Sequence, residues 1–76
     1  MNGSDIIDEE FAHNVSDSRS RLGLSQRELS ERTGIAQGDI SKLERGTANP
    51  SLKTLTRLAA GLGMKLDIKL APIDHN

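Results

Sequence analysis

The apolar residues of this chain recur at helical spacing in four stretches. The first stretch predicts a helix from about Asp5 to Leu22. A second helix is predicted from Gln26, a third over about 36–44, and a fourth from Ser51 onward. The apolar faces expected for the first and fourth helices comprise Ile7, Phe11, Val15 and Leu22, and Leu52, Leu55, Leu58, Ala59 and Leu62, respectively.

Glycine, serine and proline mark the ends of these helices. Gly23 ends the first helix and Gly63 the fourth. Ser25 directly precedes the second helix, and Glu28 follows Ser25 by three positions, which is the spacing of a capping box. The cluster at 47–50 combines threonine, asparagine and proline, and it predicts a turn before the last helix.

Residues 26–45 (QRELSERTGIAQGDISKLER) have the pattern of two short helices joined by a sharp turn. Gly34 lies where the chain must reverse, and glycine takes φ > 0 there without a steric penalty. Ser30 is small at the point where two helices crossing at ~90–120° come closest. The pattern predicts a helix-turn-helix, whose second helix can enter the DNA major groove. The expected inner faces carry Leu29, Ser30, Ile40 and Leu43, and the turn is Thr33-Gly34-Ile35.

The segment after the fourth helix changes period. Apolar and charged residues alternate strictly from Met64 to Leu70, which predicts a short β-strand that Pro72 ends. No second strand is evident in the sequence, so we expect the same strand of a second subunit to pair with it antiparallel across a two-fold axis. The alternative is an irregular tail folded onto the fourth helix. The residues expected at the dimer contact are Met64, Leu66, Ile68 and Leu70.

Length and composition indicate one small domain. The chain has 76 residues, of which 34% are hydrophobic and one, Phe11, is aromatic, so the core is thin and oligomerisation would supplement it. The predicted organisation is a flexible N-terminus (1–4), a helix-turn-helix domain (5–63), a dimerisation strand (64–71) and a flexible tail (72–76).

Several function classes lack the residues that they need. The chain has no cysteine, which excludes disulfides, thiol chemistry and cysteine-based zinc sites. His13 and His75 are too isolated to predict a metal site, and no serine stands in a recognisable catalytic arrangement. We therefore expect no enzyme, cofactor or metal. The acidic first residues and the absence of a long apolar run predict neither a signal peptide nor a membrane contact, and favour a cytoplasmic, nucleoid-associated protein.

The charge is distributed unevenly along the chain. The formal net charge is −1, yet residues 19–57 hold eight basic and four acidic residues, whereas residues 1–18 hold five acidic residues and no Lys or Arg. The basic excess coincides with the helix-turn-helix, which favours a nucleic-acid partner. Solvated helix faces are the alternative explanation of the same asymmetry.

One set of residues between positions 19 and 62 carries a family resemblance: Gly23-Leu24-Ser25-Gln26, Glu28-Leu29, Gly34-Ile35, Ile40-Ser41, Leu43-Glu44-Arg45-Gly46, Pro50-Ser51-Leu52 and Leu55. With these residues, the segment 19–62 resembles the phage-repressor-like (Xre or Cro/C1-type) helix-turn-helix family. The tail from Leu62 to Leu70 further resembles the antitoxin-type branch, such as HigA- and HipB-like regulators, which append a short strand that helps to build a dimer.

The resemblance implies a mainly α, four- to five-helix lambda-repressor-like fold with the third helix as the DNA reader. Gln26 matches the position that the family uses for a phosphate contact, and the N–H groups of a helix N-terminus suit the same ligand. Gln37 matches the leading base-reading position, where glutamine can make a bidentate contact to adenine worth ~1–3 kcal/mol. The predicted DNA contacts are Gln26, Arg27, Gln37, Gly38, Ser41, Lys42, Thr47, Asn49, Ser51 and Lys53.

Two features of the third helix depart from the family pattern. Gly38 offers no side chain to the groove, and glycine inside a helix costs ~1 kcal/mol relative to alanine. Asp39 is repelled by phosphates, although it suits the positive end of the helix dipole.

Arg19 and Glu44 align with a pair that joins the first and third helices in several relatives, which implies a structural role.

The sequence as a whole predicts a homodimeric, sequence-specific regulator that reads a palindromic operator in double-stranded DNA. A repressor or autoregulator fits this description, and the tail is compatible with an antitoxin whose second partner is a toxin protein. The alternative is a protein-interaction module that keeps the fold without reading DNA, as Gly38 and Asp39 allow.

Overall fold

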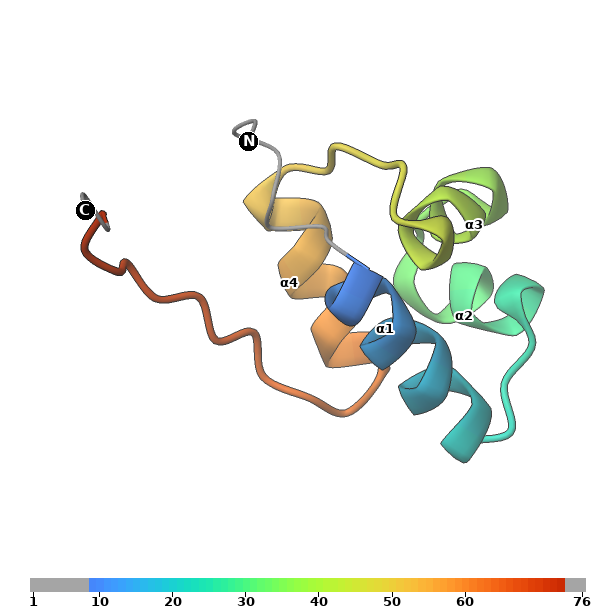
Figure 1. Ribbon diagram of the computed structural model, residues 1–76. Helices are drawn as coiled ribbons and strands as arrows, with labels where there is room; N and C mark the ends of the chain where they lie inside the picture. The colour runs from blue at the N-terminus through green and yellow to red at the C-terminus, as the bar shows by residue number, and fades with distance from the viewer. Residues whose placement is uncertain (1–8, 74–76) are drawn as a thin grey trace.

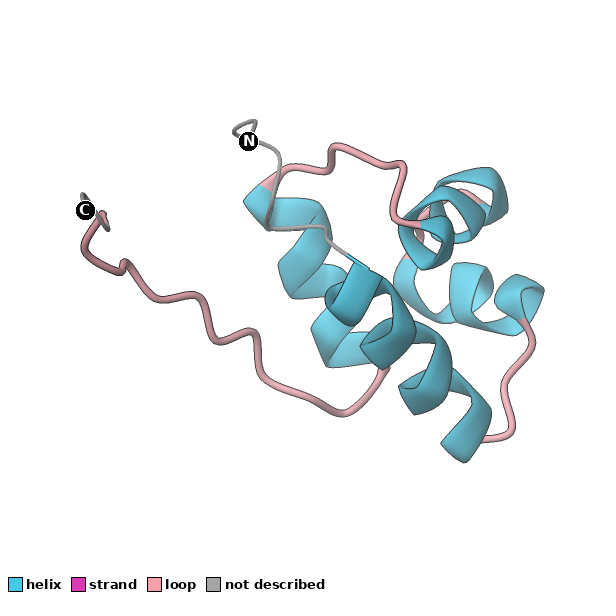
Figure 2. Ribbon diagram, in the orientation of Figure 1, coloured by secondary structure: helices cyan, strands magenta, loops and turns pink. Residues whose placement is uncertain are grey.

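The structure is a computed structural model that describes residues 9–73, and in this part of the chain it contains four α-helices and no strand (Figures 1 and 2). This confirms the mainly α fold. The predicted start of the first helix at Asp5, the apolar Ile7, the flexible N-terminus at 1–4 and residues 74–76 of the predicted flexible tail (72–76) lie outside the described residues. The helices are α1 (Glu9–Arg21), α2 (Gln26–Thr33), α3 (Gln37–Arg45) and α4 (Leu52–Gly61).

The ends of α2 and α3 follow from the predicted capping residues. The Ser25 hydroxyl accepts a hydrogen bond from the Glu28 N–H at 3.0 Å, and the Glu28 carboxylate accepts one from the Ser25 N–H at 2.8 Å. This confirms the capping box. Gly34 ends α2 with φ 77° and Gly46 ends α3 with φ 74°, both in the left-handed region that glycine adopts at helix ends. α3 begins one residue later than expected because Ala36 serves as its N-cap, without a side-chain hydrogen bond.

The core lies where α1, α2 and α4 meet around α3. Leu29 and Ile40 have no exposed surface, and Leu43, Leu55 and Leu58 are 1% exposed. The inner faces predicted for the helix-turn-helix are therefore confirmed for these apolar residues. The buried cluster comprises Val15, Leu29, Ile35, Ile40, Leu43, Leu55, Leu58 and Leu62, with Phe11, Leu24, Ala48 and Leu66 packed against it.

Two leucines assigned to apolar helix faces are exposed, so the predicted faces were wrong at their ends. Leu22 is 48% exposed because α1 ends at Arg21 and Leu22 falls in the following turn. Leu52 is 60% exposed because it is the first residue of α4, a turn before the buried Leu55. In both cases the helical spacing continues past the point where the helix has a neighbour to pack on.

The predicted strand over 64–71 is absent from the described chain, and residues 64–73 form an irregular loop that follows the end of α4 (Figure 2). A strand needs a partner for its backbone groups, and residues 9–73 offer no second extended segment of this kind. The Met64 N–H instead donates to the Ala59 carbonyl at 2.8 Å and closes the end of α4. Leu66 is half-buried against the core, which agrees with a tail folded partly onto α4.

Gly61 allows α4 to approach α2 closely. A Cβ atom at this position would overlap the Thr33 Cγ2 atom, and the Gly61 carbonyl accepts a hydrogen bond from Arg32 Nη1 at 3.2 Å. Since interior methyl groups cannot interpenetrate, Gly61→Ala would have to push α4 from α2 or force Thr33 out of its rotamer.

We therefore expect Gly61→Ala to lower the free energy of unfolding by about 1–3 kcal/mol, measured by urea denaturation followed by circular dichroism. Gly38→Ala is the matched control for stability. Gly38 also lies in a helix, but its Cβ would meet nothing within 4 Å. This change should leave the free energy of unfolding unchanged or raise it by up to ~1 kcal/mol. Equal losses in the two variants would contradict the close approach at Gly61.

Within residues 9–73, none of the helices has the length and apolar composition that crossing a membrane requires.

Candidate nucleic-acid interface

The turn between α2 and α3 is held by side chains on both sides of Gly34. The Ser30 hydroxyl donates to the Ile35 carbonyl, and the Gly34 N–H donates to the Ser30 carbonyl at 2.8 Å. The Thr33 hydroxyl donates to the Leu29 carbonyl at 2.8 Å and accepts from the Ile35 N–H at 3.2 Å. These bonds use the polar groups of the turn internally, so α3 has a fixed orientation relative to α2.

α3 is buried on one face and exposed on the other. Ile40 and Leu43 lie in the core, whereas Gln37, Gly38 and Lys42 are exposed. The structure therefore places these three residues, which were predicted to contact DNA, on the exposed side of one short helix. Glutamine and lysine at such positions can reach the edges of bases or phosphate oxygens.

Four of the predicted contact residues surround one hollow between α3 and the loop that leads to α4. Its volume is about 390 Å³, and Asp39 also lines it. Asp39 was expected to act on the helix dipole, and its position beside the hollow adds a negative charge near these residues. The four predicted residues in the hollow are Lys42, Thr47, Asn49 and Ser51.

Two hydroxyls of this hollow already have partners in the protein. The Ser51 hydroxyl caps α4, since it accepts from the Thr54 N–H at 3.2 Å. The Thr47 hydroxyl lies 3.4 Å from the Lys42 carbonyl at the end of α3. Both residues therefore have a structural role in addition to the predicted phosphate contact.

Three charged or amide side chains join α1, α2 and α3 beside this surface. Arg19 Nε donates to Glu44 Oε2 at 2.7 Å and Arg19 Nη2 donates to Glu44 Oε1 at 2.9 Å, a bidentate ion pair. Arg19 also donates to the Leu24 carbonyl at 2.8 Å. Gln26 Nε2 donates to the same Glu44 Oε1 at 3.2 Å. The implied structural pair is thus present, and it holds the side chain of Gln26 as well.

Burial raises the pKa of the Glu44 carboxyl, but the hydrogen bonds from Arg19, Gln26 and Ser16 and the positive charge of Arg19 together lower it by more, so this pKa lies below its ordinary value. The hydrogen bond to Glu44 raises the pKa of the Arg19 guanidinium. Glu44 is therefore ionised at neutral pH and fixes one amide N–H of Gln26.

The remaining predicted contacts lie outside the hollow. Arg27 lies on the exposed side of α2, where its Nε is 3.8 Å from Glu31 Oε2. Lys53 is exposed in the first turn of α4. The Ser41 hydroxyl accepts a hydrogen bond from Arg45 Nη1 at 2.6 Å. Arg45 was missing from the predicted set, although its spacing of four residues from Ser41 on a helix indicated that the two side chains are neighbours.

His13 is exposed on α1, and no group of three or more metal-ligating side chains occurs within residues 9–73.

Comparisons with known proteins agree with this geometry. The family model for the HTH_3 helix-turn-helix matches residues 18–69, which include α2, the turn and α3. The geometry of α2 and α3 and this match define the chain as a helix-turn-helix protein. The chain belongs to the HTH_3 family, which confirms the resemblance to Xre or Cro-type proteins.

Relatives named as uncharacterised HTH-type transcriptional regulators occur in distant organisms. One from Haemophilus influenzae is 45% identical over 67% of this chain and 52% of its own length. The y4dJ protein of Sinorhizobium fredii is 40% identical over 75% of this chain and 74% of its own length. The chain thus spans about half of the first relative's length and about three quarters of the second's.

A solved structure shares the fold. The crystal structure of an HTH_3 family transcriptional regulator from Vibrio cholerae superposes with a TM-score of 0.73 at 26% sequence identity. The match covers 82% of this chain and 35% of that one.

Proposed function

We propose that this chain is a sequence-specific double-stranded DNA-binding regulator of transcription that reads its operator through α3. The observation that carries this proposal is the position of Gln37 and Lys42 on the exposed face of α3, while Ile40 and Leu43 anchor the opposite face in the core. The names of the relatives as transcriptional regulators support the same function. Its site of action would be nucleoid DNA in the cytoplasm.

Phosphate contacts would fix α3 in the groove. Gln26 stands at the first position of α2, and its orientation is held by Glu44. The N–H groups of this helix N-terminus and the Gln26 amide suit one phosphate oxygen. Arg27, Asn49 and Lys53 are exposed and would contact the DNA backbone on either side of α3. These contacts set position, whereas Gln37 and Lys42 would set sequence.

The active form in this proposal is a homodimer on a palindromic operator, with the two copies of α3 ~34–36 Å apart or a multiple of that distance. Exposed apolar side chains in the tail support a contact between copies. Met64 is 47% and Ile68 44% exposed, and Leu70 is fully exposed. The half-buried Leu66 would complete this contact. A dimer of this kind would repress or autoregulate a promoter by occupying it.

The same exposed apolar tail gives a second candidate partner, a toxin protein bound by an antitoxin. Unpaired apolar residues on a small domain are a common mark of a protein contact. The further alternative is an interaction module that does not read DNA. Two residues of α3 favour it: Gly38, which has no side chain to contact a base, and Asp39, whose negative charge is repelled by phosphates.

Selection from a random DNA duplex pool tests the proposal. We expect the unchanged chain to enrich a palindrome, and the double variant Gln37→Ala/Lys42→Ala to lose at least ~30-fold in affinity for it, since two base contacts of ~1–3 kcal/mol each are removed. Arg57→Ala is the matched control, because Arg57 is exposed on α4 outside the predicted contacts. Enrichment of no motif by the unchanged chain, with only weak salt-dependent binding, would exclude DNA reading and leave the interaction module.

A further inference from the structure

Gly38 lies inside α3, at a position where the packing of the chain does not require a glycine. Its backbone is helical and lacks the positive φ that Gly34 and Gly46 have at the helix ends. A Cβ atom at position 38 would meet no atom within 4 Å. Glycine within a helix is less stable than alanine, so the chain gives up helix stability here without a contact in return. The reason for this glycine therefore lies outside the packing of the chain.

Gly38 occupies the outermost position of α3. Successive residues of an α-helix turn by about 100°, so position 38 lies about 160° around the helix from Ile40 and about 140° from Leu43. These two side chains point into the core, where they are 0% and 1% exposed. Gly38 accordingly faces away from the core, which is the direction in which α3 would enter a DNA groove.

The missing side chain leaves an open notch in the outer face of α3. Lys42 and Ser41 follow one turn later, about 40° to one side of Gly38 and about 60° to the other. None of their side-chain atoms comes within 4 Å of the position that a Cβ atom of residue 38 would take. The notch at Gly38 is thus a space of about one methyl group, among side chains predicted to contact DNA.

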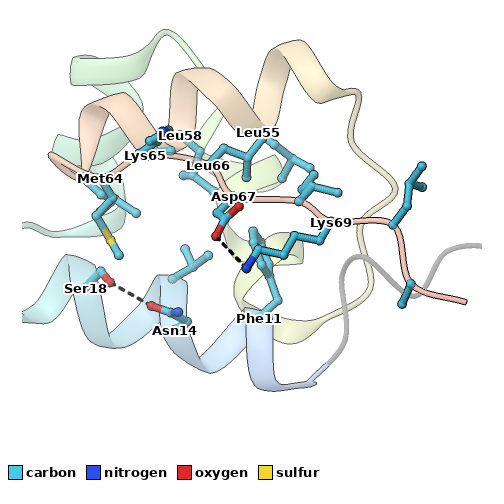
Figure 3. A pocket seen from close by; sticks show the side chains of 16 residues that line it. Phe11, Asn14, Ser18, Leu55, Leu58, Met64, Lys65, Leu66, Asp67 and Lys69 are labelled. Carbon is cyan, nitrogen blue, oxygen red and sulfur yellow. Dashed lines mark hydrogen bonds and ion pairs between the residues drawn. The ribbon is translucent and has the colours of Figure 1, made fainter.

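α3 has no room to move toward the core. Ile40 and Leu43 fill its inner side and are fully packed. An apolar cavity of about 850 Å³ does exist in the described chain, but it lies between α1, α4 and the segment 64–71, and no residue of α3 lines it (Figure 3). A group added at the notch would therefore press outward, against the ligand that α3 contacts.

We propose that the notch at Gly38 holds the C5-methyl group of a thymine in the major groove, which makes Gly38 a specificity-determining residue. This inference rests on the proposed function, in which α3 enters the major groove, and it names a base that α3 selects there. Gly38 would select this base by the space that it leaves, whereas Gln37 and Lys42 would act through their side chains.

The chemistry of the notch favours a methyl group over the other groups of the major groove. The base edges present hydrogen-bond donors and acceptors there, and thymine adds an apolar methyl group. On its outer side Gly38 offers only its Cα carbon. A donor or acceptor pressed against this carbon would lose its hydrogen bond to water without a replacement. A methyl group loses no hydrogen bond and gains apolar contact.

Removal of one methyl group from the DNA tests the contact from the ligand side. The probe is the palindrome enriched by the selection described above, in which each thymine of the half-site is replaced in turn by uracil, which lacks only the methyl group. We expect one of these replacements to weaken binding by the unchanged chain about 4-fold per half-site, because one buried methyl contact is lost. The other replacements should have smaller effects.

Addition of one methyl group to the protein tests the contact from the other side. Gly38→Ala should bind the thymine probe at least ~5-fold more weakly per half-site, because two methyl groups would then claim one space. On the probe with uracil at the sensitive position, Gly38→Ala should bind within ~2-fold of the unchanged chain, since the alanine methyl replaces that of thymine. The urea titration described above verifies that this variant is folded.

Arg57→Ala is the matched control for both probes. Arg57 is exposed on α4, outside the predicted contacts. This variant should show the same loss on uracil as the unchanged chain and no additional loss on the thymine probe.

The outcomes separate this inference from the DNA function. Equal weakening of Gly38→Ala on the thymine and uracil probes overturns the methyl contact, as does a palindrome in which no thymine responds to replacement by uracil. Undiminished binding of Gly38→Ala to the thymine probe overturns the notch as a site. In each of these cases the enriched palindrome still supports DNA reading. Enrichment of no motif overturns both.

Discussion

Glu44→Ala should unfold most of the chain at room temperature. The change removes the carboxylate that holds the Arg19 guanidinium, whose side chain is only 17% exposed. Breaking a buried ion pair by removing one partner costs about 3–5 kcal/mol because the other charge stays desolvated. A domain of this length has about that much stability in total. Circular dichroism in a urea titration measures the loss.

An exposed ion pair supplies the control. Arg27 and Glu31 are 79% and 68% exposed at 3.8 Å, and pairs of this kind contribute little. Glu31→Ala should therefore change the free energy of unfolding by less than ~0.5 kcal/mol. A loss below about 1 kcal/mol in Glu44→Ala would contradict a desolvated pair.

The ion pair of Arg19 and Glu44 also predicts how the stability of the chain depends on pH. The pKa of Glu44 is lowered in the folded chain from its ordinary 4.5, so the folded state binds this proton less tightly than the unfolded state does. The stabilisation is then fully present above about pH 4.5 and is lost as pH falls through the lower folded pKa. The stability gap between the unchanged chain and Glu44→Gln, which keeps the shape without the charge, should therefore shrink in acid. A gap that grows below pH 4.5 would contradict the sign.

The helix-turn-helix could be predicted because its geometry is encoded locally. Each position has a role that follows from its neighbours in sequence: Gly34 ends a helix, Ser25 caps one, and Ser30 is small on the inner face. The structure confirms these roles. The pairing of Arg19 with Glu44 could not be derived from their 25-residue separation. It came from the family resemblance.

The features that the sequence did not reveal depend on which helices and segments contact each other in the folded chain. Periodicity placed Leu52 beside Leu55, but it carries no information on where a neighbouring helix ends. The hydrogen bond from Gln26 to Glu44 needs the relative placement of α2 and α3. The tail shows the same limit, because its alternation specifies a strand only if a second chain supplies the partner. The DNA contacts stay predictions until the selection is done.

Leu55→Ala should lower the free energy of unfolding by about 2–5 kcal/mol. Leu55 is 1% exposed and lies in the buried cluster with Leu58 and Leu29. Truncation removes apolar contacts and leaves a cavity that a helix fixed at both ends can close only in part. Thermal and urea denaturation should both detect the loss, and much of the chain should be unfolded without denaturant because the core is small.

Leu52→Ala is the matched control for this change. Both variants replace leucine by alanine in α4, so both gain the same small amount of helix propensity. They differ only in how deeply the leucine is packed. Leu52 is 60% exposed, and its truncation should change the free energy of unfolding by no more than ~0.5 kcal/mol. Comparable losses would mean that Leu52 is buried in solution, as its helical spacing suggests. A contact from another copy or another protein would then have to cover it, because the packing within one chain leaves it in solvent.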